Sequence, residues 1–247
     1  MKTAGDDMET ILDETNTSTF EELYISVRRK ERRLVSDAEL MFLPDVESSH
    51  VHYNEWLIRK RSSMRLIAYL KKKKRPLKIL EIGCGNGWLS SRLSAIPSTT
   101  VIGLDINEPE INQAKRVFKK DNLDFLMGIF TPELFPGEKF DIILFAASIQ
   151  YFPSLKDVLQ QALHCLTEHG EIHLVDSHFY EPSEVKNAAA RCIDYYTNLG
   201  FPEMAAHYFH HSTTDLLPFN CTMLINPGSL MNRISKKEPF YWIAIKN

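Results

Sequence analysis

Short apolar runs, separated by amphipathic segments, constrain the fold of this chain more than any other feature of its sequence. The runs cover residues 77–83, 100–106, 140–146 and 171–177, and a weaker run covers residues 124–127. Each is bounded by turn or polar residues, as is typical of buried parallel strands. Strands that alternate with helices predict right-handed crossovers and a doubly wound sheet, in which ligands bind at the carboxyl ends of the strands.

The segments between these runs have the spacing of helices that pack on a sheet. Residues 108–119 and 155–166 place apolar side chains on one face. We expect Gly170 to end the second of these helices, because glycine is common just beyond a helix C-terminus. A further helix should begin near Trp88, and a longer one is predicted from residue 183 to residue 199.

The C-terminal part of the chain departs from this alternation. Residues 221–226 and 240–245 are two more apolar runs, and no crossover helix is predicted between them. Strands joined in this way pair in antiparallel fashion. The predicted fold class is therefore α/β, with a doubly wound sheet that is mainly parallel and has an antiparallel C-terminal edge.

The N-terminal part is predicted to be helical after a polar tail. Residues 1–17 are rich in Asp, Glu and Thr with few apolar side chains, so we expect disorder there. Ser18 and Ser36 each begin a capping-box pattern, and the first should lead into a helix with a mixed-charge face at residues 28–33. A longer helix should cover about residues 54–73, with an apolar stripe on one side. The stripe consists of Leu57, Met64 and Ala68.

These elements divide the chain into parts. After the tail of residues 1–17, residues 18–75 should form a helical extension and residues 76–247 the sheet domain. A cap is expected to be inserted at about residues 178–220. The extension and the cap should cover the carboxyl edge of the sheet, where ligands bind in this class of fold.

Composition and charge narrow the class of protein further. The chain has 247 residues, a net charge of −3 and four well-separated cysteines without a CxxC pair. This charge gives no overall field that would attract nucleic acid or an anionic membrane, and the cysteine spacing argues against zinc and disulfides. The N-terminus lacks a signal-peptide pattern, and no apolar run is long enough to span a membrane. We expect a soluble, cytoplasmic protein with no nucleic-acid or membrane partner.

Glycines at alternate positions, Gly83, Gly85 and Gly87, follow the first apolar run directly. Glycine allows a sharp turn from strand to helix, and its missing Cβ lets a ligand approach the free N–H groups at the helix N-terminus. The GxGxG spacing differs from the GxGxxG of dinucleotide-binding proteins. Glu81 lies just before the loop, where a carboxylate suits a ligand with an ammonium group better than a pyrophosphate. Asp105 ends the second run, where its carboxylate can accept hydrogen bonds from both hydroxyls of a ribose.

These residues resemble the class I S-adenosylmethionine-dependent methyltransferases, and most closely their type 11-like, small-molecule branch. The first motif of that family has the form E/D-x-G-x-G-x-G, here Glu81 to Gly87, and the resemblance covers residues 77–177 well. It implies a Rossmann-like fold, with S-adenosyl-L-methionine as cofactor and S-adenosyl-L-homocysteine as product. It also implies direct in-line displacement, which transfers the methyl group to a small-molecule acceptor.

The resemblance further implies a set of cofactor-binding residues. In the family the loop holds the methionine part, the acid at Glu81 lies near the amino group, and the residue after the ribose-binding acid packs on the adenine. This chain has Gly128-Ile129 where relatives often have Gly-Asp, so backbone groups would contact the adenine amino group instead. The full set is Glu81, Gly83, Cys84, Gly85, Gly87, Asp105, Ile106, Gly128, Ile129 and Phe145, the last through its backbone carbonyl.

The catalytic residues are not specified by any motif, because methyl transfer requires no covalent nucleophile. Candidates for a general base or an acceptor contact follow the runs at residues 140–146 and 171–177, or precede the long helix. They are Gln150, Tyr151, His178, Tyr180, His52 and Tyr53. Three further histidines, His207, His210 and His211, are predicted to line a pocket or the surface rather than bind a metal.

Three other functions are compatible with parts of the sequence. A nucleic-acid methyltransferase would use the basic run at residues 71–75, although such a run also suits the C-terminus of a helix. A protein that binds S-adenosylmethionine without catalysis needs no catalytic residue. An NAD-dependent dehydrogenase is the weakest alternative, because the glycine spacing is wrong for it.

Overall fold

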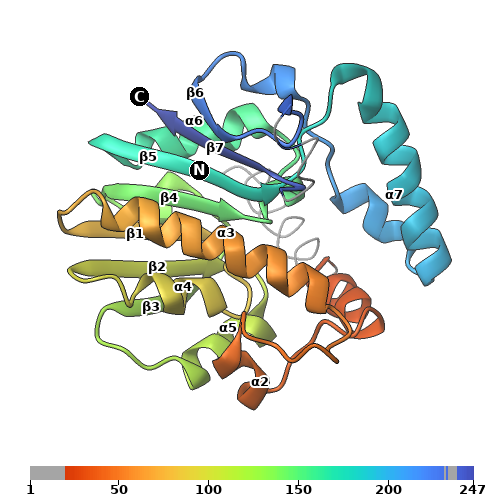
Figure 1. The fold of residues 1–247 in the computed structure, drawn as a ribbon, viewed down its shortest axis with the longest axis horizontal. Coiled ribbons are helices and arrows are strands. Elements are labelled where there is room, and N and C mark those ends of the chain that lie inside the picture. Colours follow the sequence, from red (N-terminus) through yellow and green to blue (C-terminus); the bar gives the residue numbers. More distant parts are fainter. Residues whose placement is uncertain (1–19, 231, 233–237) are drawn as a thin grey trace, which may run out of the picture.

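A computed structural model of the chain describes residues 20–230, 232 and 238–247 (Figure 1). The predicted tail at residues 1–17 and the capping residue Ser18 lie outside this range. A seven-stranded sheet forms the centre of the fold, in the order β3-β2-β1-β4-β5-β7-β6. No helix in the described ranges is both long and apolar enough to cross a membrane.

The sheet is parallel except at one edge, as predicted. The parallel strands are β1 (Leu77–Ile82), β2 (Thr99–Asp105), β3 (Leu123–Met127), β4 (Phe140–Ala146) and β5 (Leu166–Ser177). The antiparallel strands are β6 (Asn220–Ile225) and β7 (Tyr241–Lys246). The α/β fold class expected from the apolar runs is therefore confirmed.

Helices cover both faces of the sheet (Figure 1). One face packs against α2 (Asp37–Phe42), α3 (Tyr53–Lys71), α4 (Trp88–Leu93) and α5 (Glu108–Val117). The other face packs against α6 (Leu155–His164). A helix at residues 20–30 and α7 (Val185–Leu199) lie beyond the carboxyl ends of the strands. Short 3₁₀ helices complete the chain: η1 (Pro132–Leu134), η2 (Ile149–Tyr151), η3 (Pro182–Glu184), η4 (Pro202–His207) and η5 (Thr213–Leu216). The division into extension, sheet domain and cap stays a prediction.

Two local predictions were wrong. The stripe on α3 faces solvent, since Leu57 and Met64 are 38% and 54% exposed and Ala68 is exposed as well. The buried face carries Ser63, Leu66 and Leu70 instead. The sheet decides which face of α3 is buried, and the weak apolar periodicity of this helix does not reveal it.

Gly170 does not end α6, because that helix stops at His164 and β5 has already begun at Leu166. A Cβ at Gly170 would lie 2.9 Å from the carbonyl oxygen of Phe140. The glycine therefore permits close approach of β5 to β4 at a bulge in their pairing.

A buried polar network joins α3 to β5 and β7. Glu171 on β5 accepts hydrogen bonds from Tyr69 Oη at 2.9 Å and from Lys73 Nζ at 2.8 Å. His173 Nε2 and Lys246 Nζ lie 3.1 Å and 3.0 Å from its carboxylate oxygens. These partners hold the pKa of Glu171 below its usual range despite its burial.

Candidate functional site

The glycine loop after β1 has the left-handed backbone that glycine adopts most readily. Gly83, Gly85 and Gly87 have φ values of +75°, +53° and +74°. A Cβ at Gly83 would lie 2.4 Å from the Cβ of Ser148, and one at Gly87 would lie 2.4 Å from the ring of Phe125. A side chain at either position would clash with these neighbours, so glycine is needed there for steric reasons as well as for the turn.

Hydrogen bonds fix this loop to the end of β2. Asp105 Oδ2 accepts from the Gly85 N–H at 2.8 Å, and Oδ1 accepts from the Asn107 N–H at 2.9 Å. Burial raises the pKa of Asp105 against the effect of these bonds. The backbone of Ile106 also contributes a hydrogen bond to this carboxylate, which has about four acceptor sites and so keeps room for a further donor.

Glu81 lies at the end of β1 and is 2% exposed. Its Oε2 accepts a hydrogen bond from Ser90 Oγ at 2.5 Å. Burial, with a smaller effect of the nearby Asp105, raises the pKa of Glu81 to about 8. A cation that approached this carboxylate would favour its ionised form.

Two adjoining cavities open at the carboxyl ends of the strands. The outer cavity, of about 340 Å³, lies over the ends of β1, β2 and β3 and has a largely apolar wall. The inner cavity, of about 260 Å³, lies toward β4 and β5 and is lined by many charged side chains. Both are lined by Tyr24, Gly83, Gly85, Ala147 and Tyr151. One elongated ligand that passes the glycine loop can therefore occupy both.

Most of the predicted cofactor-binding residues line these cavities. Gly83 and Gly85 line both, and Glu81 and Cys84 line the inner cavity. The remaining residues at the outer cavity are Asp105, Ile106, Gly128 and Ile129.

Gly87 and Phe145 line neither cavity. Gly87 is the N-cap of α4, and the fully buried Phe145 packs against Phe152 with ring centroids 5.5 Å apart. Ala146 and Ala147 form the cavity wall at the end of β4.

The candidate catalytic residues are divided between the cavities and the surface. Tyr151 lines both cavities and Gln150 lines the inner one. His52 lines the inner cavity as well, and its Nε2 lies 2.8 Å from the carbonyl oxygen of Glu31.

The other candidates lie away from the cavity walls. His178 is exposed and packs against Phe240 with ring centroids 4.6 Å apart. Tyr180 forms a β-bridge with Ser212. Tyr53 begins α3 and is not part of either wall.

The three C-terminal histidines do not converge. His207 lines the outer cavity, whereas His211 Nε2 lies 3.1 Å from the carbonyl oxygen of Ile149. His210 packs between the rings of Tyr180 and Tyr208. Within the part of the chain that the structure describes, no group of three or more His, Cys, Asp or Glu side chains is placed to hold a metal ion.

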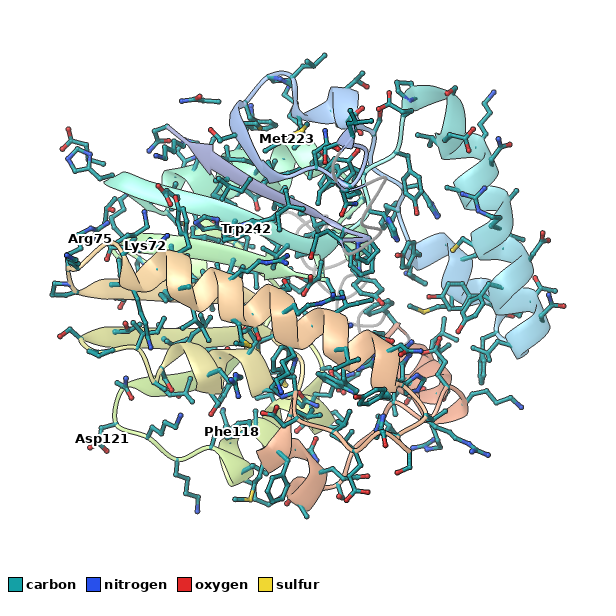
Figure 2. All side chains as sticks on the ribbon, in the orientation of Figure 1. Lys72, Arg75, Phe118, Asp121, Met223 and Trp242 are labelled. Carbon is teal, nitrogen blue, oxygen red and sulfur yellow. The ribbon has the colours of Figure 1, made fainter. Side chains whose placement is uncertain are left out.

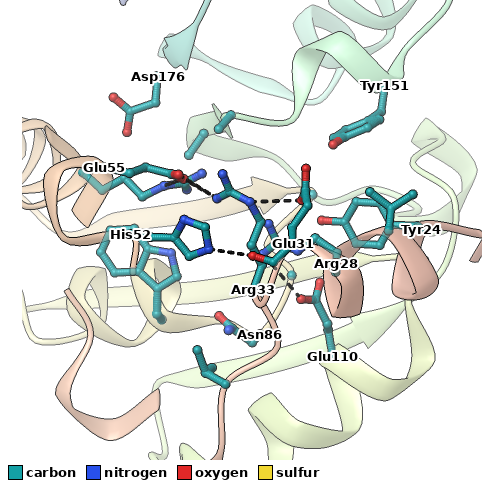
Figure 3. A pocket seen from close by; sticks show the side chains of 18 of the residues that line it. Tyr24, Arg28, Glu31, Arg33, His52, Glu55, Asn86, Glu110, Tyr151 and Asp176 are labelled. Carbon is teal, nitrogen blue, oxygen red and sulfur yellow. Dashed lines mark hydrogen bonds and ion pairs between the residues drawn. The ribbon is translucent and has the colours of Figure 1, made fainter. Parts of the chain in front are cut away.

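The sequence did not reveal the contribution of the helix at residues 20–30. Arg28 from this helix lines the inner cavity, and its Nη2 lies 4.0 Å from Glu110 Oε1 on α5 (Figure 3). The buried Arg28 Nε–H has no hydrogen-bond partner among the described residues. Glu110 reaches the glycine loop, because its Oε2 lies 3.0 Å from the position of a Cβ on Gly85. Burial raises the pKa of Glu110 to about 7, against the effect of Arg28.

Asp176, near the end of β5, was also missed. It lines the inner cavity and has a φ of +55°, which is uncommon for a residue other than glycine. An acidic residue at the carboxyl end of a central strand was the available signal.

The basic run at residues 71–75 precedes β1 and lies at the amino ends of the parallel strands, opposite the cavities. Lys73 pairs with Glu171, and Arg75 pairs with Asp141 at the start of β4. Figure 2 shows Lys72 and Arg75 at the left edge of the molecule, away from the helices that cover the cavities. Two of the cations of this run therefore contribute to ion pairs within the fold.

Comparison with known proteins identifies the family. Residues 73–237 match the family described as a methyltransferase domain. Because the match covers more than half of the 247 residues, the chain belongs to this family. The prediction made from the Glu81 to Gly87 motif is confirmed at this level.

Curated relatives match this chain over part of their length. The 27-O-demethylrifamycin SV methyltransferase of Amycolatopsis mediterranei is 28% identical over 103 residues, which is 40% of this chain and 38% of that protein. The malonyl-[acyl-carrier protein] O-methyltransferase of Halalkalibacterium halodurans is 26% identical over 134 residues, 50% of this chain and 49% of that protein. The matches thus span less than half the length of each relative.

Solved structures share the fold over nearly the whole chain. Magnesium protoporphyrin IX methyltransferase from Synechocystis PCC 6803 with bound SAH has a TM-score of 0.56 at 15% identity, covering 97% of this chain and 100% of that one. The plantazolicin methyltransferase in complex with SAH has a TM-score of 0.54 at 16% identity, covering 95% and 98%. The Rossmann-like methyltransferase fold is confirmed.

Proposed function

We propose that this chain is an S-adenosylmethionine-dependent methyltransferase that acts on a small-molecule acceptor. One observation carries the proposal: Glu81 and Asp105 end adjacent strands on either side of the glycine loop, where the two cavities meet. The family supports it, as do the names of the two curated relatives, the 27-O-demethylrifamycin SV methyltransferase and the malonyl-[acyl-carrier protein] O-methyltransferase. Two neighbours of the same fold hold S-adenosylhomocysteine.

The residues present fit this cofactor. The carboxylate of Asp105, which lines the outer cavity, suits a ribose hydroxyl, and the apolar wall near Ile106 and Ile129 suits an adenine ring. In the inner cavity, Glu81 is a buried carboxyl group with no ion pair among the described residues, which suits the ammonium group of the methionine part. The guanidinium of Arg28, which lines the same cavity, suits its carboxylate.

The protein's share of the chemistry is to position the reactants and exclude water. When bound, the sulfonium supplies an electrophilic methyl group on a leaving group that is already cationic. Tyr24 and Tyr151 belong to the wall shared by both cavities, so they border the place where the two reactants meet. Burial raises the pKa of Tyr151 to about 12, so its hydroxyl stays protonated at neutral pH and can donate a hydrogen bond rather than act as a base.

The first test is a calorimetric titration of the protein with S-adenosylhomocysteine, with NADH titrated in parallel. We expect micromolar binding of S-adenosylhomocysteine alone. The variant Asp105→Ala should bind about tenfold more weakly or worse, because two charged hydrogen-bond acceptors are lost. The control Asp194→Asn removes an exposed carboxylate on α7 and should leave the affinity unchanged. Equal affinities of Asp105→Ala and wild type would refute the role of Asp105.

A further inference from the structure

Asp176 occupies an unusual position in the sheet. The pairing of β5 with β7 shifts register between Val175 and Ser177, so Asp176 is the extra residue of a bulge. Bulges often redirect a side chain beside a functional site, and here the side chain lines the inner cavity. Its φ of +55° is a conformation that Asp and Asn tolerate better than most residues.

Asp176 differs from the other acids on its side of the inner cavity because it has no ion pair with any residue that the structure describes. Arg33 Nε lies 3.0 Å from Glu31, and its Nη1 lies 2.6 Å from Glu55. Arg59 also pairs with Glu55, at 3.0 Å. Figure 3 shows this chain of pairs in the cavity, with none to Asp176. None of the described cations lies within ion-pair distance of it.

The other groups around Asp176 neutralise it only in part. A hydrogen bond from Ser62 and the positive charge of Arg59, at longer range, favour the ionised form of Asp176. The negative charges of Glu55 and Glu238 disfavour it. Burial dominates and raises the pKa of Asp176. The site thus holds a partly buried carboxylate with no cation within ion-pair distance among the described residues.

Aromatic rings line the same cavity. The ring centroids of Tyr24 and Tyr151 lie 5.7 Å apart, those of Tyr151 and Tyr208 5.8 Å, and those of Tyr196 and Tyr208 6.4 Å. All four tyrosines belong to the inner wall. Arg28 already lies over the ring of Tyr24, 5.6 Å from its centroid, so this wall chiefly offers aromatic surface for the apolar part of a ligand.

The cofactor's own ammonium does not account for Asp176. Glu81 ends β1 and Asp176 lies near the end of β5, with β4 between them in the sheet. Two strand spacings correspond to about 9–10 Å between the backbones. In addition, Glu81 pairs in register with Leu144 and Leu144 with His173, so Asp176 lies three residues further along β5 than the level of Glu81. Each carboxylate can therefore be matched by a cationic group of its own, and a second cationic group would match Asp176.

On the basis of the proposed function, we propose that the inner cavity binds a methyl acceptor that carries a protonated amino group, and that Asp176 contacts this group. The acceptor is thus a small amine with an apolar part that packs against the tyrosines. This inference concerns recognition of the acceptor and leaves the methylated atom open.

The test uses the full-length protein saturated with S-adenosylhomocysteine. It is titrated calorimetrically with small primary amines, from ethylamine to 2-phenylethylamine, and with the alcohol of each carbon skeleton. We expect at least one amine to bind, its alcohol to bind about tenfold more weakly or worse, and Asp176→Asn to lose this preference. Asparagine is nearly isosteric and tolerates the same φ, so the variant should fold.

Two controls separate this inference from the proposed function. Asp176→Asn should bind S-adenosylhomocysteine within twofold of wild type, and Asp194→Asn should keep the preference for amines. If the cofactor product binds but no amine does, or if amine and alcohol bind equally, the inference is wrong while the proposed function stands. If Asp176→Asn loses the cofactor product, Asp176 belongs to the cofactor site. Failure of wild type to bind S-adenosylhomocysteine would refute both.

Discussion

Acidic side chains are buried in two regions of this molecule, and cations match them more completely in one region than in the other. Beneath α3, Glu171 contacts Lys73 and Lys246, and its pKa is lowered. At the carboxyl ends of the strands, burial raises the pKa of Glu81 to about 8 and that of Glu110 to about 7. A buried carboxylate that is paired with cations stabilises the fold. A buried carboxylate that lacks such partners lowers the stability of the folded chain until a cation binds beside it. The contrast distinguishes a structural network from a binding site.

The largest expected effect is on the structural side of this comparison. Glu171→Gln should lower the free energy of unfolding by about 2–4 kcal/mol at pH 7, because two lysines lose their anion. Urea denaturation measures this effect. The control Glu168→Gln changes an exposed acid on the same strand and should alter stability by less than about 0.5 kcal/mol. Equal effects of the two variants would remove the distinction drawn here.

The same network predicts a direction of pH dependence. The folded pKa of Glu171 is below the ordinary value of 4.5, so its contribution to stability is present above about pH 4.5 and is lost as the pH falls further. The difference between wild type and Glu171→Gln should therefore shrink in acid.

A smaller effect of opposite sign is expected in the binding site. The folded pKa of Glu81 is raised from 4.5 to about 8, so ionisation increasingly favours the unfolded chain as the pH rises through this range. Glu81→Gln should therefore raise the unfolding free energy of the ligand-free protein, by about 1–3 kcal/mol at pH 8. The same variant should bind S-adenosylhomocysteine about tenfold more weakly. If Glu81→Gln is less stable than wild type and binds S-adenosylhomocysteine with the same affinity, Glu81 stabilises the fold and does not bind the cofactor.

The smallest expected signal is a proton released on binding. An ammonium group beside Glu81 lowers the pKa of that carboxyl, so binding of S-adenosylhomocysteine at pH 7 should release up to about one proton. Calorimetry in buffers of different ionisation enthalpy measures this number. The release should fall in Glu81→Gln, and an unchanged release would assign the proton to another group.

The sequence was most informative where the signal is local. Continuous apolar runs predicted the parallel strands, because buried strands must be apolar on both faces. The antiparallel edge was predicted from two runs with no crossover helix between them. The acids near the ends of β1 and β2 were singled out from their position near the end of an apolar run. The exposed face of α3 and the start of β5 were not predicted correctly, because they depend on which surfaces pack together.

The residues of the inner cavity divide in the same way. The GxGxG loop, Glu81 and Asp105 are neighbours of strands that can be recognised in the sequence, so the sequence by itself determined the fold, the family and the predicted cofactor residues. Arg28 and Asp176 reach the cavity from a distant helix and from a bulge between β5 and β7. Only the tertiary structure decided their place, because burial and the absence of a cation partner depend on contacts between segments far apart in the chain.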